Sequence, residues 1–449
     1  MKPPALNAPR DAAPAGAWGR LRLPAIAGSA TGSLATAFAA QALLVISGVL
    51  AVRLLGPTNR GHLALFALLP VVITQVGLFG VQDALTYWIA RDRRSAAGIL
   101  RTMAWPIATQ TLFCCLVHIA GFWLLARDED RSVQIAGLVT LAVTPAYLAF
   151  NYGLAILKGL QHFGAINTLR LVPLILYGLA LAPIFLLDED RLPAVAVGWA
   201  AAHLVTAIAA IALTLRRLPR GQEPVTIPPR ADLFRFGAKG FVGSASPLET
   251  FRLDQAVVGL FLSPAALGLY VASLAFTNLP RFVAGSVGTV AFPYIASQPD
   301  DRLARRSMWR FFWATVGCSL LIAAVLMAAA RELVPLLFGA EFRDAVVPAQ
   351  ILLAGSVVGG ARRILGEGLR GMGNPTAITV AEVASWIWLV PALVVLTPRW
   401  ELAGVAVALL SASLCGLIVL AAIIVAGREP EPRLATRRTP WASRWIGDG

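Results

Sequence analysis

Charged residues are scarce in this chain of 449 residues. Asp, Glu, Lys and Arg together make up 14% of the sequence, whereas hydrophobic residues make up 57%. Soluble globular domains carry about 25% charged residues, and the mean hydropathy of +0.72 lies well outside their range. The composition therefore excludes an ordinary soluble domain and indicates a polytopic membrane protein.

Lysine and cysteine are scarcer still. The three lysines, Lys2, Lys158 and Lys239, stand in no phosphate-binding loop, which excludes ATP hydrolysis by this polypeptide. The four cysteines lie inside apolar runs without the spacing of a zinc site or a disulfide framework, so we expect buried, reduced thiols. We expect no metal and no cofactor. Basic residues cluster in loops between apolar runs, which favours membrane topology over nucleic acid as a partner.

Long polar loops are also missing. The segments RDEDR (127–131) and DEDR (188–191) contain the Asp-x-Asp of metal-dependent glycosyltransferases, but both occupy short loops with no fold to hold a metal. The segment GEGLRG (366–371) matches a dinucleotide fingerprint, yet it ends an apolar run and follows no strand. A membrane glycan polymerase or ligase needs a sizeable outer loop for its catalytic groups. The sequence therefore predicts a protein that is not an enzyme.

Apolar runs are abundant, and many reach the roughly 20 residues needed to cross about 30 Å of hydrocarbon. We expect an all-α membrane protein with about 12 transmembrane helices. The predicted spans lie near residues 30–55, 62–90, 98–126, 133–157, 163–187, 193–215, 233–262, 266–297, 309–334, 345–370, 376–397 and 402–426.

Lys and Arg are shared unevenly between the two sides that these helices define. With a cytoplasmic N-terminus, the inner segments hold 28 basic residues and the outer loops hold eight. Because the side rich in Lys and Arg stays in the cytoplasm, we expect both termini inside. The predicted organisation is a disordered cytoplasmic arm (1–29), an N-lobe (30–217), a cytoplasmic linker (218–232), a C-lobe (233–427) and a basic cytoplasmic tail (428–449).

The two halves of the chain repeat a pattern. Pro57 and Gly61 stand four apart in GPTNRG, and Pro264 and Gly268 stand four apart in SPAALG, 207 residues later. A second match, between LKGLQHFGAIN from residue 157 and LRGMGNPTAIT from residue 369, has an offset of 212. Two matches at equivalent places predict a duplicated six-helix unit, with two lobes related by a pseudo-two-fold axis along the membrane normal and a cavity between them.

Four segments resemble the oligosaccharide or O-antigen flippase family (Wzx-like) of the MOP superfamily, which also contains MATE exporters. They are RLLGPTNRGHLALFALLPVVITQVGLFGVQDAL, FRLDQAVVGLFLSPAALGLYVASLAF, LVPLLFGAEFRDAVVPAQILLAG, and the long segment from LRGMGNPTAIT to LLSASL. The resemblance implies two helical lobes that move a polyprenyl-diphosphate-linked oligosaccharide to the outer leaflet. Its implied partners are membrane lipids, H⁺ or Na⁺ as a coupling ion, and a polysaccharide polymerase with chain-length proteins.

Three charges fall within six residues of the predicted seventh helix: Glu249, Arg252 and Asp254. A charge at the bilayer centre costs about 2.5–3.5 kcal/mol on insertion scales, so these side chains should face a wet or protein-lined interior. Glu249 and Arg252 are three apart and share a helix face, whereas Asp254 points elsewhere. We expect Arg252 to meet a diphosphate or an acidic sugar, and either acid to take part in ion coupling or to hold the arginine. A packing salt bridge is the alternative.

Further basic residues extend this candidate site. Arg281 follows Pro280 in the next helix, where it would line the cavity or pair with Asp254. In GGARRILGEGLRG, Arg363 and Glu367 are four apart and should pair. That leaves Arg362 and Arg370 to contact phosphate near the inner mouth or to snorkel to the headgroups.

Partners are also predicted for three more charged residues. Under the repeat, Arg170 and Glu382 occupy equivalent positions in the two halves, so they would close an inner gate or pair locally. Asp83 should pair with the basic loop at Arg91.

The sequence thus favours a flippase for a lipid-linked oligosaccharide that works by alternating access through an arginine-lined cavity. A MATE-like ion-coupled exporter of drugs or small molecules is the alternative. Such an exporter, with apolar cations as cargo, would favour acids and aromatic residues over arginines. A scaffold for a glycan assembly complex remains a third class.

Overall fold

The computed structural model describes residues 23–187, 191–219, 227–244, 252–296, 298–374 and 376–426. These residues form helices and connecting turns without a strand, which confirms the all-α prediction. The helices of the first half are α1 (Leu23–Leu78), α2 (Val81–Arg91), α3 (Ala96–Ala126), α4 (Arg131–Thr140), α5 (Val143–Gly159), α6 (Phe163–Ile184) and α7 (Arg191–Arg217). Those of the second half are α8 (Arg230–Ser244), α9 (Leu253–Phe261), α10 (Pro264–Ala296), α11 (Asp301–Phe338), α12 (Val346–Gly371) and α13 (Thr376–Val425). Short 3-10 helices η2 (Arg93–Ser95) and η3 (Ala340–Ala345) precede α3 and α12.

Two of these helices each contain two helices joined at a kink. Gly56 (φ 66°, ψ 179°) divides α1, and Glu401 (φ 47°, ψ −123°) divides α13. Within the described residues, eight helices are long and apolar enough to cross a membrane, or nine if the bent α10 counts as one span. The chain is therefore a multi-pass membrane protein, while a count of twelve spans stays a prediction.

Two predicted spans each contain two helices. The span 133–157 consists of α4 and α5, which a turn at Leu141 and Ala142 separates but which together form one candidate membrane span, Arg131–Gly159. The span 233–262 consists of α8 and α9, so the prediction of one continuous helix through Arg252 is wrong. Apolar composition continues across residues 141 and 142, which is why hydropathy alone does not reveal the turn there. The first helix also begins earlier than predicted, at Leu23 rather than near residue 30.

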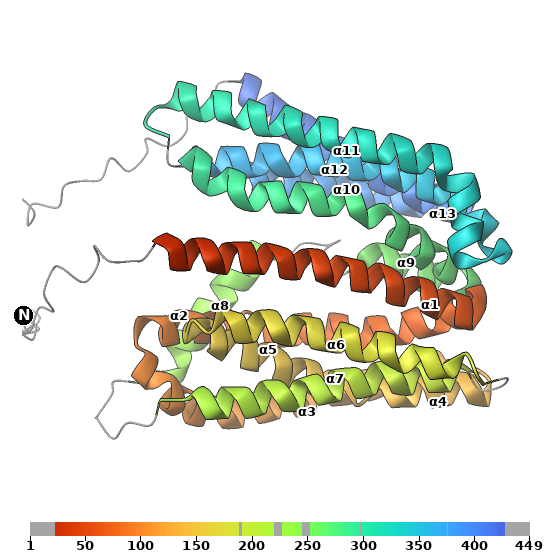
Figure 1. Cartoon of the computed structure of the whole chain (residues 1–449), viewed down its shortest axis with the longest axis horizontal. Helices are drawn as coiled ribbons and strands as arrows, with labels where there is room; N and C mark the ends of the chain where they lie inside the picture. The colour runs from red at the N-terminus through yellow and green to blue at the C-terminus, as the bar shows by residue number, and fades with distance from the viewer. Residues whose placement is uncertain are drawn as a thin grey trace, which may run out of the picture.

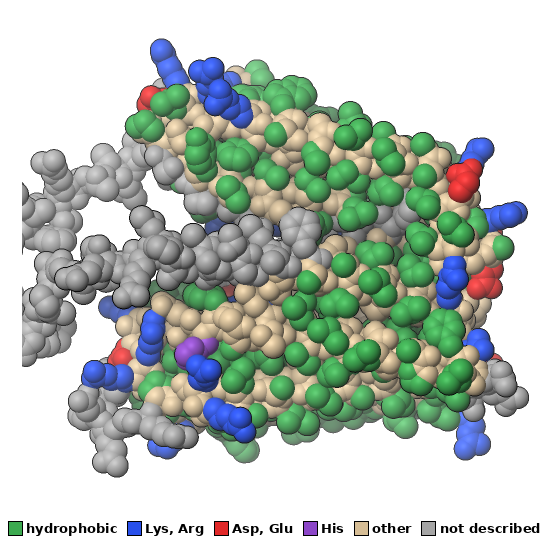
Figure 2. Space-filling model, in the orientation of Figure 1, with side chains coloured by type: hydrophobic (Ala, Val, Ile, Leu, Met, Phe, Trp, Pro, Cys, Tyr) green, Lys and Arg blue, Asp and Glu red, His purple; other side chains and the backbone are tan. Residues whose placement is uncertain are grey.

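The helices run side by side along the long axis of the molecule, with α2 to α7 on one side and α10 to α13 on the other (Figure 1). On the face shown in Figure 2, Lys, Arg, Asp and Glu gather toward the two ends, and hydrophobic side chains cover the middle. Large apolar side chains such as Trp123, Leu124 and Trp313 are more than 60% exposed. An apolar belt of this kind fits a lipid environment, because exposed apolar surface is unfavourable in water.

The two Pro-x-x-x-Gly turns pack on each other at one end of the molecule, which we call the turn end. A Cβ atom placed on Gly61 would lie 1.6 Å from the carbonyl oxygen of Pro264, and one placed on Gly268 would lie 2.0 Å from that of Pro57. Each proline therefore contacts the glycine of the other turn. Reciprocal contact is what a two-fold relation between the halves requires.

The second repeated segment also folds in the same way twice. His162 N–H donates to Leu157 O and Asn374 N–H donates to Leu369 O, both at 2.9 Å, as in a Schellman cap. Gly159 contacts the backbone carbonyl of Thr86 in α2, and Gly371 contacts that of Phe292 in α10, 206 residues later. Equivalent turns thus pack on equivalent helices, which supports the pseudo-two-fold relation.

A further contact between the halves involves Arg53 of α1. Its guanidinium Nε donates to Leu337 O at 2.7 Å and its Nη2 donates to Leu336 O. These carbonyls belong to the last turn of α11, where a positive side chain is favourable. Together with the paired turns, this contact closes the turn end of the interface between the halves.

Candidate functional site

A cavity of about 960 Å³ lies between the two halves of the protein. Its lining comes from α1, α5, α6 and α7 of the first half and from α9, α10, α12 and α13 of the second. The space is large enough for a drug-sized or glycan-sized ligand. The lining includes five arginines (Arg60, Arg252, Arg281, Arg362 and Arg363) and three acids (Asp254, Glu367 and Glu382).

Arg252 stands immediately before α9 in a left-handed backbone conformation (φ 45°, ψ 46°). This conformation costs a non-glycine residue about 1–2 kcal/mol. The helix N-terminus is also unfavourable for a positive charge. Both features lower the local stability at Arg252, and unfavourable conformations of this kind are concentrated at functional sites. The side chain is exposed to the cavity, and no carboxylate among the described residues lies within 4.0 Å of its guanidinium.

Asp254 lies two residues further on, in the first turn of α9, where a negative charge is favourable. It is 6% exposed and accepts a hydrogen bond at 2.7 Å from the hydroxyl of Tyr270 in α10. Its second oxygen, Oδ1, has no hydrogen-bond partner in the described part of the chain. Asp254 is therefore a buried carboxylate with one oxygen available to a proton or a cation.

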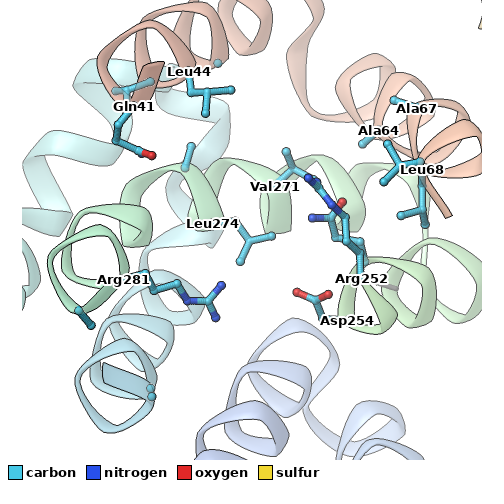
Figure 3. A pocket seen from close by; sticks show the side chains of 18 of the residues that line it. Gln41, Leu44, Ala64, Ala67, Leu68, Arg252, Asp254, Val271, Leu274 and Arg281 are labelled. Atoms are coloured by element: carbon cyan, nitrogen blue, oxygen red, sulfur yellow. The ribbon is translucent and has the colours of Figure 1, made fainter. Parts of the chain in front are cut away.

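Arg281 follows a bend of 51° in α10 between Ala275 and Leu279. Its guanidinium and the carboxylate of Asp254 point into the same open space, with Arg252 at the other side (Figure 3). Arg281 does not form the ion pair with Asp254 that was the alternative prediction, since no contact within 4.0 Å joins them. Within the described residues, Arg281 is thus a second cavity arginine without an acidic partner.

The pairing predicted in α12 needs correction. Arg362 Nη2 lies 3.0 Å from Glu382 Oε2 in α13, and Arg362 Nη1 donates to Ser385 Oγ at 2.9 Å. Arg370 pairs with Glu367 at 3.7 Å, three residues away, and it lies over the ring of Phe292. Arg362 and Arg370, which were predicted to remain available, are therefore both paired, whereas Arg363, which was predicted to pair with Glu367, lines the cavity.

Of the remaining predicted charges, Glu382 lines the cavity, whereas Arg170 and Asp83 are absent from its lining. Arg170 is exposed and absent from the cavity lining, and Glu382 pairs with the neighbouring Arg362, so the proposed Arg170–Glu382 gate is not formed in this conformation. Asp83 and Arg91 lie in the first and last turns of α2, about 12 Å apart along the helix. The pairing of Asp83 with the basic loop that follows α2 therefore stays a prediction, and Glu249 lies outside the described residues.

The sequence analysis missed Arg60 and an aromatic group. Arg60 was counted among the basic residues of an outer loop, but its side chain lines the cavity and its Nε atom is buried without a hydrogen-bond partner among the described residues. Tyr147, Trp199 and His203 line the first-half wall. The four-residue spacing of Trp199 and His203 on one helix is the signal that could have identified this group.

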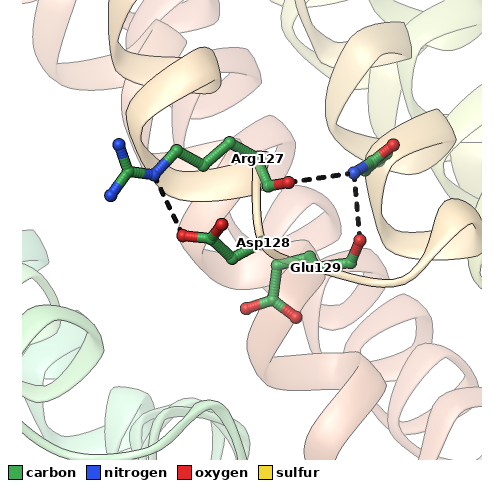
Figure 4. Close-up of polar contacts among 4 residues, drawn as sticks. Arg127, Asp128 and Glu129 are labelled. Carbon is green, nitrogen blue, oxygen red and sulfur yellow. Dashed lines mark hydrogen bonds and ion pairs between the residues drawn. The ribbon is translucent and has the colours of Figure 1, made fainter.

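The Asp-x-Asp segment at 127–131 lies in a loop, as predicted. Arg127 Nε donates to the neighbouring Asp128 at 2.9 Å, and Asp128 is 85% exposed. The side chain of Gln134 donates to the backbone carbonyls of Arg127 and Glu129 and holds the turn (Figure 4). The loop is thus stabilised by local contacts. The corresponding residues 188–190 lie outside the described residues.

The pair between Arg362 and Glu382 is expected to contribute to stability. Replacing Glu382 by Gln leaves the partly buried guanidinium without its counter-charge, whereas the double replacement Arg362→Gln and Glu382→Gln removes both charges. In thermal denaturation in detergent, a double-mutant cycle should give a coupling of about 1–2 kcal/mol. The same cycle on the exposed pair Arg127 and Asp128 should give under about 1 kcal/mol. Equal couplings would contradict the assignment.

The helical fold, with a cavity between its two halves, is that of a polytopic membrane protein with the fold of the MOP superfamily. The structure is similar to the lipid II flippase MurJ in an inward closed conformation, with a TM-score of 0.69, 14% identity and coverage of 88% of this chain and 87% of MurJ. It is also similar to an inward-facing multidrug resistance MATE transporter of the MOP superfamily, with a TM-score of 0.60, 16% identity and coverage of 88% and 98%.

The polysaccharide biosynthesis protein family matches residues 49–347, and the chain belongs to this family. Among curated proteins, it is 22% identical over 365 residues to the probable low-salt glycan biosynthesis flippase Agl15 of Haloferax volcanii. That alignment covers 79% of this chain and 74% of the relative. The resemblance to a flippase family of the MOP superfamily, made from four sequence segments, is thereby confirmed.

Proposed function

We propose that this protein is a flippase that moves a polyprenyl-diphosphate-linked oligosaccharide from the inner to the outer leaflet of a bacterial cytoplasmic membrane. The observation that carries the proposal is the pair of cavity arginines, Arg252 and Arg281, neither of which has an acidic partner among the described residues. A planar guanidinium stays charged and donates two parallel hydrogen bonds, which suits a phosphate. Family membership and the similarity to Agl15, a probable glycan biosynthesis flippase, support the same cargo class.

The mechanism we propose is alternating access. The diphosphate and glycan enter the cavity from the cytoplasmic side while the prenyl tail stays in lipid. The halves then rock against each other, so that the turn end opens and the opposite end closes. Under this proposal both termini are cytoplasmic and the turn end faces outward, in agreement with the bias of 28 inner against eight outer basic residues.

Asp254 is the group that we propose for ion coupling. Its buried carboxylate keeps Oδ1 without a hydrogen-bond partner among the described residues, while Tyr270 holds Oδ2. Uptake of H⁺ or Na⁺ at this oxygen would reduce the negative charge beside the arginines and thereby change their affinity for an anion. A polysaccharide polymerase and chain-length proteins are the partners that such a cargo implies.

Cargo charge distinguishes this function from export of a cationic drug. The cavity lining has five arginines against three acids, so purified protein should bind farnesyl diphosphate at least about tenfold more tightly than the cation ethidium. The affinity for the diphosphate should fall as salt rises, because the charges are screened. Tighter binding of ethidium in equilibrium titrations would favour the exporter and overturn the proposal.

A further inference from the structure

The two halves of the protein contribute different kinds of side chain to the cavity wall. Among the described lining residues, every charged side chain except that of Arg60 comes from α9, α10, α12 or α13. The wall from α5 and α7 instead presents Tyr147, Trp199 and His203, all half-buried and open to the cavity. The two walls are therefore suited to different parts of one ligand.

The three rings of the α5–α7 wall are held in a fixed arrangement. His203 Nδ1 lies 2.8 Å from the carbonyl oxygen of Trp199 and must donate to it, which leaves Nε2 as the acceptor in the neutral ring. The hydroxyl of Tyr147 donates to this Nε2 at 3.2 Å. The ring of His203 stands 4.9 Å from the centroids of both Tyr147 and Trp199. Such an arrangement loses little conformational entropy when it binds a ligand.

A sugar ring is the ligand chemistry that fits this wall. The C–H groups on the face of a pyranose carry partial positive charge and contact the negative face of an aromatic ring, while ring hydroxyls need hydrogen-bond partners like those of Tyr and His. A cation would also favour an aromatic surface. However, Arg252 lies within electrostatic reach of the Tyr147 hydroxyl, and its charge would repel a cation bound there.

We propose that Tyr147, Trp199 and His203 form a sugar-binding platform, which contacts the first sugar rings of the glycan while Arg252 and Arg281 on the facing wall hold the diphosphate. This inference rests on the proposed function and deepens it by assigning glycan recognition to the first half and phosphate recognition to the second. The platform would then determine which glycan is accepted.

Carriers that differ only in their sugar test the platform. The probes are farnesyl diphosphate and three derivatives carrying glucose, galactose or N-acetylglucosamine, titrated calorimetrically into the full-length protein. At least one derivative should bind the wild-type protein about tenfold more tightly than the bare carrier. Trp199→Ala should remove this gain and keep the affinity for the bare carrier within about twofold. Trp199→Phe, which keeps an aromatic face, should retain part of the gain.

A lipid-facing tryptophan provides the matched control. Trp313 of α11 is 65% exposed and outside the cavity lining, so Trp313→Ala should retain the full gain from the sugar. The platform is overturned if no derivative binds the wild-type protein more tightly than the bare carrier. It is also overturned if Trp199→Ala weakens bare and glycosylated carriers by the same factor. Arg252→Gln should instead weaken all four carriers, and its failure to do so would contradict the phosphate assignment alone.

Discussion

Replacement of Arg252 and Arg281 by glutamine is expected to reduce transport of the lipid-linked glycan at least about 100-fold. A hydrogen bond between charged groups contributes about 1.5–3 kcal/mol, and the loss of two such contacts corresponds to a factor of this size or larger. Glutamine keeps most of the length of the side chain but removes the charge. The measurement is the rate of glycan delivery in proteoliposomes, with insertion and folding of the variant verified.

Conservative replacements sharpen this test. Arg252→Lys should restore only part of the rate, because an ammonium group lacks the planar fork that binds two phosphate oxygens at once. Arg310 of α11 is exposed and outside the cavity lining, so Arg310→Gln should transport normally. A folded double variant of Arg252 and Arg281 that transports at the wild-type rate would show that these arginines do not bind the cargo.

Addition of one methyl group at Gly61 is expected to trap the protein with its turn end open. The new Cβ atom would lie 1.6 Å from the carbonyl oxygen of Pro264, which is backbone and has no rotamer with which to yield. Alanine favours a helix by about 0.5–1 kcal/mol over glycine, so reduced helix propensity cannot explain a loss. Gly61→Ala should lower transport at least about tenfold, and Gly268→Ala, with its Cβ 2.0 Å from Pro57 O, should act in the same way.

Accessibility of the cavity measures this trapping directly. A cysteine introduced at the cavity residue Leu274, in a chain without its four native cysteines, reports entry of an impermeant maleimide from the side of the turn end. Gly61→Ala should accelerate labelling. Gly285 lies in α10 like Gly268, but a Cβ there meets no atom within 4 Å, so Gly285→Ala serves as the control. Unchanged labelling and transport in Gly61→Ala would remove the paired turns from the gating account.

Much of the fold could be predicted because composition and repetition act over long distances in the chain. Apolar runs determine a helical membrane protein, since only helices and closed barrels satisfy every backbone group in lipid. The paired Pro-x-x-x-Gly motifs indicated the duplication, and the structure brings those motifs into contact. The break before α9 was missed because Arg252 is no helix breaker by residue type, yet its backbone is left-handed in the structure.

The candidate site was predictable in its residue types but not in its pairings. Helix spacing identifies partners on one helix, and it predicted Arg363 as the partner of Glu367, whereas the structure places Arg370 at 3.7 Å from Glu367. It cannot identify a partner on another helix, so the contact of Arg362 with Glu382 had no signal in the sequence. Arg60 was misplaced for a related reason, because a long side chain in a turn can reach back into a cavity.

The most direct test of the central claim is the movement of a fluorescent polyprenyl-diphosphate oligosaccharide across proteoliposomes containing the purified protein. The account predicts transfer between leaflets that depends on the protein, is inhibited by soluble farnesyl diphosphate competing for the cavity arginines, and is lost in the double variant of Arg252 and Arg281. Transfer at the rate of protein-free vesicles, under every ion gradient applied, would contradict the claim.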